Sequence, residues 1–77
     1  MEIKMAITSA RLKELRKGKK VTQRAMAQLL GVTDRHYQAM EAGSINIPSL
    51  TLKCLADYFG VSADYLLGRT DNPEVNR

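Results

Sequence analysis

The stretch of residues 22–40 decides the fold and reads TQRAMAQLLGVTDRHYQAM. Thr22 can cap a helix, because its side-chain oxygen can accept an amide N–H of the first turn. Thr33 can cap a second helix in the same way, and Gly31 between them suits the left-handed residue that ends a helix. Apolar residues repeat between the two caps at helical spacing, at Met26, Leu29 and Leu30. The stretch therefore predicts two short helices joined by a tight turn.

Three further helices are predicted by similar signals on either side of this stretch. A capping residue or a proline precedes each apolar run, and a glycine follows it. The start signals are Thr8 or Ser9, Pro48 and Ser62, and the end signals are Gly18, Gly60 and Gly68. No stretch alternates as a strand would. The sequence therefore predicts an all-α domain of five short helices.

The chain of 77 residues is short enough for a single domain. We expect an N-terminal arm at residues 1–7, a folded domain at residues 8–69 and a flexible, polar C-terminal tail at residues 70–77. No run approaches the roughly 18 apolar residues of a membrane span, and no secretory leader is recognisable. We therefore expect a cytoplasmic protein that does not contact membranes.

One cysteine and one histidine are too few for an intramolecular disulfide or a structural zinc site. We therefore expect no metal and no cofactor. The cysteine, Cys54, stands beside Leu52 and Leu55, so we expect a buried, inert thiol. As a catalytic base, His36 would need a nucleophile and an orienting group beside it, but the lone cysteine belongs to a different helix that is expected to pack in the core. The chain is therefore not expected to be an enzyme.

The net charge is +4 and the isoelectric point is about 9.5. Such a small basic domain suits a polyanionic partner, because neutralising phosphates releases counterions, but a solvated basic surface gives the same charge. Two alternatives likewise stay open for the basic run Lys17, Lys19 and Lys20. These side chains either contact phosphate or belong to a solvated loop.

Two segments of the chain resemble each other, and each is a candidate for the turn of a helix-turn-helix. Residues 26–33 read MAQLLGVT and residues 55–62 read LADYFGVS, so each has a helix, a glycine, a valine and a cap. Acidic residues, Asp57 and Asp64, surround the second turn and would repel phosphates. Hydrogen-bond donors surround the first turn, at Gln23, Arg24, Arg35, His36 and Gln38. Charge therefore selects the first turn as the candidate site for duplex DNA.

Helix-turn-helix geometry suggests how the segment around this first turn would bind DNA. The helix that begins at Gln23 would lie across the DNA backbone, where its N-terminal amides can hold a phosphate. The next helix would enter the major groove with its N-terminal residues at the base edges. Arg35 suits guanine and Gln38 suits adenine. Asp34 could accept from cytosine, cap its helix, or hold Arg35 in place.

An ordered set of motifs runs through about residues 8–70. It comprises Thr22-Gln23, Ala27, Gly31-Val32-Thr33, Glu41-x-Gly43, Pro48-Ser49-Leu50 and Gly60-Val61-Ser62-x-Asp64-Tyr65-Leu66-Leu67-Gly68. The set resembles the phage repressor and Cro type of helix-turn-helix domain, the XRE family. The resemblance implies a five-helix fold, DNA reading by the third helix, here residues 33–42, and homodimers on operators with two half-sites.

The resemblance also implies roles for individual residues. Gln23 matches a position that holds phosphate, and Arg16 and Glu41 match a partly buried structural ion pair. Matching positions that face the groove are Asp34, Arg35, His36 and Ala39. With the donors already named, the candidate DNA contacts are Thr22, Gln23, Arg24, Thr33, Asp34, Arg35, His36, Gln38 and Ala39.

The chain departs from the family pattern in two places. The family carries glycine at the position of Lys20, whereas this chain has Gly18, so we expect an early end of the first helix and a different loop. Tyr37 replaces an aliphatic residue. Its ring can be half buried, but its hydroxyl must then reach water, DNA or a partner.

The fifth helix carries three consecutive bulky residues, Tyr65, Leu66 and Leu67. They either complete the core or form a dimer surface, and we favour the dimer surface because one short helix cannot turn all three to one core. The sequence as a whole predicts a sequence-specific regulator of transcription, a repressor, that binds a double-stranded operator as a homodimer. The alternative is an antitoxin or a protein-interaction adaptor on the same fold, with an unidentified protein partner.

Overall fold

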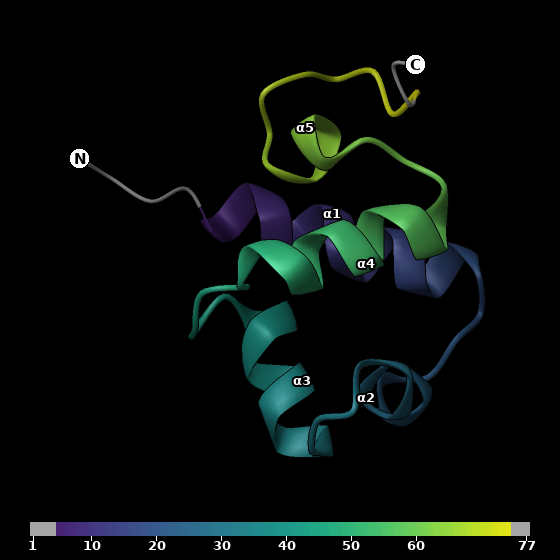
Figure 1. Cartoon of the computed structure of the whole chain (residues 1–77), viewed down its shortest axis with the longest axis vertical. Coiled ribbons are helices and arrows are strands. Elements are labelled where there is room, and N and C mark those ends of the chain that lie inside the picture. Colours follow the sequence, from purple (N-terminus) through teal and green to yellow (C-terminus); the bar gives the residue numbers. More distant parts are fainter. Residues whose placement is uncertain (1–4, 75–77) are drawn as a thin grey trace.

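The computed structural model describes residues 5–74 and contains five helices in this part of the chain (Figure 1). They are α1 (Met5–Gly18), α2 (Gln23–Leu30), α3 (Asp34–Ala42), α4 (Ser49–Phe59) and α5 (Ala63–Leu66). Residues 5–74 include no strand, so the all-α prediction is confirmed.

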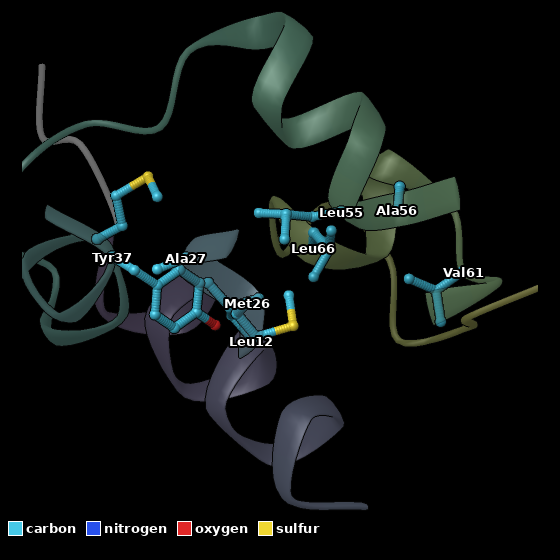
Figure 2. Packing of buried hydrophobic residues seen from close by; sticks show 9 residues of the cluster. Leu12, Met26, Ala27, Tyr37, Leu55, Ala56, Val61 and Leu66 are labelled. Carbon is cyan, nitrogen blue, oxygen red and sulfur yellow. The ribbon is translucent and has the colours of Figure 1, made fainter. Parts of the chain in front are cut away.

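The helices form two groups that α1 connects. In Figure 1, α2 and α3 lie at one end of the molecule and α5 lies at the other. The helices α2 and α3 pack on each other, and α1 packs against both α3 and α5. One apolar cluster fills the space between the helices (Figure 2), with Leu12, Met26, Ala27, Tyr37, Met40, Leu55, Ala56, Val61 and Leu66 as its buried members.

The first helix begins earlier than we expected. The structure places Thr8 and Ser9 inside α1, where both are buried, so neither caps it. Ile7 packs against Gly68, where an added Cβ would lie only 2.8 Å from the Ile7 side chain. This contact with the chain after α5 gives the first turn of α1 a tertiary partner. The predicted arm at residues 1–7 is therefore wrong from Met5 onward, and residues 1–4 lie outside the described part.

The first helix also ends like its neighbours. Lys20 has a left-handed backbone (φ 59°), and the amides of Lys20 and Val21 donate to the carbonyls of Lys17 and Arg16. Gly31, Gly43 and Gly60 make the same paired bonds after α2, α3 and α4, which is the Schellman arrangement. The predicted early end and different loop are therefore wrong. The turn has the same form, with lysine in the position that favours glycine.

Two predictions about burial fail because of helical phase. Cys54 is exposed, since the inward stripe of α4 runs through Leu55 and Ala56. In the fifth helix, Leu66 is completely buried and belongs to the core. Leu67 remains 45% exposed, and Tyr65 is half buried. Leu66 therefore cannot belong to the predicted dimer surface, and of its three residues Leu67 and part of Tyr65 remain accessible.

The segment after α5 folds back on the domain. Arg11 donates to the carbonyl oxygens of Tyr65 and Thr70 and to the carboxylate of Asp71, and its guanidinium lies 4.2 Å from the centre of the Tyr65 ring. The Ser62 amide donates to the Pro73 carbonyl at 3.0 Å. Residues 70–73 are therefore held to the domain by hydrogen bonds rather than forming a free tail, although residues 71–74 stay exposed. Residues 75–77 lie outside the described part.

Candidate nucleic-acid interface

The N-termini of α2 and α3 have the capping geometry that the sequence predicts. The Thr22 hydroxyl accepts from the Ala25 amide at 3.1 Å, and the Thr33 hydroxyl accepts from the His36 amide at 3.0 Å. Each threonine thus satisfies one amide of the first turn and leaves other N–H groups at a positive helix end. Both threonine side chains are at the surface.

The candidate base-reading side chains of α3 lie at the surface. Arg35, His36 and Gln38 are exposed, and Ala39 is half buried. Arg24 on α2 is exposed as well. Nine of the twelve lysines and arginines precede Glu41 in the sequence, against three of the eight carboxylates. The basic charge is therefore concentrated in the part of the chain that includes α1, α2 and α3.

A buried ion pair lies behind this surface. Arg16 donates to both Glu41 carboxylate oxygens, from Nε at 2.8 Å and from Nη2 at 3.0 Å, with side chains only 12% and 3% exposed. Arg16 Nη1 also donates to the Val21 carbonyl at 2.8 Å. The structure thus brings together the two residues that the resemblance paired, and they join the first helix to the third.

Gln23 belongs to the same network. Its side-chain nitrogen donates to Glu41 Oε1 at 3.3 Å, and the side chain is half buried. Burial of the Glu41 carboxylate acts to raise its pKa. The hydrogen bonds from Arg16 and Gln23, together with the positive charge of Arg16, lower the pKa and outweigh burial. The pKa of Glu41 is therefore held below its ordinary value. The ionised carboxylate fixes the Gln23 amide at the start of α2.

Tyr37 is completely buried, so the half-buried position that we expected is wrong. Figure 2 shows its ring within the apolar cluster. Among residues 5–74 no partner completes a hydrogen bond with its hydroxyl. Burial, and then the neighbouring Glu41 carboxylate, raise the pKa of Tyr37 far above its usual range. Tyr37 is therefore part of the floor beneath the exposed face of α3, and its hydroxyl is not at the surface.

Asp34 pairs with Arg24 and not with Arg35. Arg24 Nε donates to Asp34 Oδ2 at 3.2 Å, across the turn from α2 to α3. Of the roles that the sequence left open for Asp34, holding Arg35 is therefore not seen. Capping is performed by Thr33 instead.

One lysine of the basic run has a defined contact. Lys19 donates to the Tyr58 carbonyl at 3.3 Å and lies 4.2 Å from the centre of the Tyr58 ring. Lys17 and Lys20 are exposed. A residue that the sequence reasoning missed is Lys13, which lines a small hollow together with Gln23, Gln38, Glu41 and Ala42. Its position one turn before Arg16 on the same face of α1 was the available signal.

A family model described as "Helix-turn-helix domain" matches residues 10–72. The chain belongs to the XRE family of helix-turn-helix proteins. The resemblance inferred from the motifs is thereby confirmed.

Two relatives come from Bacillus subtilis (strain 168). The chain is 41% identical over 64 residues to the uncharacterized HTH-type transcriptional regulator YobD, covering 83% of this chain and 57% of that protein. It is 43% identical over 67 residues to the uncharacterized HTH-type transcriptional regulator YqaE, covering 87% and 58%. The chain thus spans somewhat more than half the length of these relatives. No solved structure matches it significantly.

No helix in residues 5–74 has both the length and the hydropathy needed to cross a membrane. The same part of the chain holds no cluster of three or more side chains suited to a metal ion.

Proposed function

We propose that this helix-turn-helix domain binds duplex DNA sequence-specifically and regulates transcription as a repressor. The observation that carries the proposal is the row of exposed donors Arg35, His36 and Gln38 along α3, beside the capped N-terminus of α2. Two relatives are named as transcriptional regulators, which supports the same role here.

In this proposal α2 holds the DNA backbone and α3 enters the major groove. The free amides at the start of α2, with Thr22, Gln23 and Arg24, face a phosphate. Thr33, Asp34 and Ala39 border the groove with the exposed donors. Tyr37 and Met40, both buried, form the floor that fixes the angle at which α3 presents these side chains.

The protein acts as a homodimer in this proposal, with two half-sites about 34 Å apart, one helical turn of DNA. An apolar hollow lined by Ile47, Pro48, Leu52 and Leu67, with Thr8, Asn46 and Ser49, supports a self-association surface. None of these residues is charged, although the chain carries +4 overall. A two-fold contact apposes identical patches, so an uncharged patch avoids repulsion between the copies. The antitoxin or adaptor alternative is weakened, because the apolar fifth helix that motivated it places Leu66 in the core.

Selection from a random duplex library tests the proposal. We expect the purified protein to enrich one short motif with two symmetric halves. No enrichment over the starting library would overturn sequence-specific binding.

Arg35→Ala tests the base-reading role of α3. It should cost about 1–3 kcal/mol of binding and relax the preference at one position of each half-site, since Arg pairs with guanine through two hydrogen bonds. Affinities for the enriched motif and for its single-base variants check this. An even loss across all duplexes would instead assign Arg35 to a phosphate contact.

A further inference from the structure

Arg24 and Asp34 form an ion pair between the two helices of the proposed interface. Arg24 is the second residue of α2 and Asp34 is the first residue of α3. Among the described residues, theirs is the ion pair that joins α2 to α3, with Nε and Oδ2 3.2 Å apart. Their side chains are 76% and 46% exposed, so the pair lies at the surface that would face DNA.

Stability of the free protein does not account for this pair. An ion pair so exposed to water contributes little, because solvent screens it and two long side chains must be ordered. The positive N-terminal end of α3 also stabilises the Asp34 carboxylate, and this stabilisation does not require Arg24. The pair therefore matters most where water is displaced, which in the proposed function is the surface against DNA.

Charge and geometry together give the pair a role there. A lone carboxylate would be repelled by phosphates, whereas Asp34 neutralised by Arg24 is not. Arg24 engages Oδ2, and Oδ1 makes no hydrogen bond within residues 5–74. Oδ1 can accept from the N4 amino group of cytosine, the base edge that suits a carboxylate. The two Nη groups of Arg24 remain able to hold a phosphate.

We propose that Arg24 is a positioning residue that makes Asp34 a specificity-determining reader of cytosine. A continuous series of hydrogen bonds then runs from a DNA phosphate through Arg24 and Asp34 to one base. This inference rests on the proposed function, since it names which base the interface selects at one position.

Four proteins test the inference in the same duplex selection: the wild type, Arg24→Ala, Asp34→Asn and the double variant. Asp34→Asn should remove a preference for one C·G pair, on the order of tenfold. Arg24→Ala should remove the preference at the same pair, and the double variant should lose no more than Asp34→Asn alone. Lys53→Ala is the control, because it breaks a surface ion pair with Asp57 on α4, outside the proposed interface, and should leave the motif unchanged. Thermal melting should show Arg24→Ala folded.

The outcomes separate the inference from the proposed function. If the wild type enriches no motif at all, the proposed function itself is overturned. A wild-type motif that Arg24→Ala binds more weakly but with all base preferences intact overturns the inference, and leaves Arg24 as a phosphate contact. A motif that Asp34→Asn does not change overturns it as well.

Discussion

Lys20 carries the only left-handed non-glycine backbone among residues 5–74. Its φ of 59° costs about 1–2 kcal/mol relative to an ordinary helical residue. The turn nevertheless forms, because Arg16 donates to the Val21 carbonyl and the Val21 amide donates back to the Arg16 carbonyl. The buried ion pair thus also holds the strained turn before α2.

Lys20→Gly should therefore stabilise the protein. Glycine adopts a positive φ without steric cost, although it loses more entropy on folding, so we expect a gain of about 0.5–1 kcal/mol in the free energy of unfolding. Urea denaturation measures this gain. Lys17→Gly is the matched control, since it removes the same charge inside α1 and should destabilise. A Lys20→Gly variant no more stable than the wild type would show that the turn stores no strain.

At the scale of elements, one carboxylate connects three helices. Glu41 of α3 accepts from Arg16 of α1 and from Gln23 of α2. Pairs with side chains this buried are expensive to break, because the remaining charge is left without a partner. The orientation of α2 and α3, on which any groove contact depends, is therefore tied to the charge state of Glu41.

Acid should loosen this connection. Because the folded-state pKa of Glu41 lies below the ordinary value of 4.5, its contribution to stability is complete above that value. It is lost as the pH falls through the folded-state pKa. NMR titration of the wild type should place the Glu41 pKa below 4.5, and a pKa at or above that value would contradict the network. Denaturation against pH should show a weaker acid dependence for Glu41→Gln, while the exposed Glu14→Gln should match the wild type.

For the whole molecule, charge and apolar surface are on different parts. Most of the basic residues precede Glu41 in the sequence, whereas the apolar hollow lies where the loop before α4 and the end of α5 meet α1. Separation of this kind would let one copy hold DNA and a second copy at once. It fits the proposed homodimer, because each partner would keep its α3 free.

Leu67→Ser should weaken the proposed dimer. Leu67 lines the hollow and is 45% exposed, so a polar side chain there removes apolar contact area from a self-association surface without opening the core. Sedimentation of the wild type and the variant, with and without DNA, measures the change. Leu29→Ser is the control, since Leu29 on α2 is also 45% exposed and lies outside the hollow. Equal dimerisation of the two variants would place the interface elsewhere.

The local signals were sufficient for the number of helices and for three of the caps, but not for the start of α1. Thr22, Thr33 and Ser62 cap the helices that they were predicted to cap, because a capping oxygen and the amide it binds are only three residues apart. The motif set was sufficient for the family. The selection by charge of one of two similar turns as the DNA-binding site stays a prediction.

Tertiary structure decided what depends on residues far apart in sequence. Thr8 and Ser9 are buried within α1, Cys54 is exposed and Leu66 belongs to the core. Each of these positions depends on which face of a helix packs against another helix. Asp34 found Arg24 across the turn, and Arg11 bound a segment about sixty residues away. The sequence by itself thus determined where the two-helix stretch at residues 22–40 begins and turns. Only the packing decided which of its side chains support one another and which remain free to meet DNA, because such contacts depend on distance in space and not on spacing along the chain.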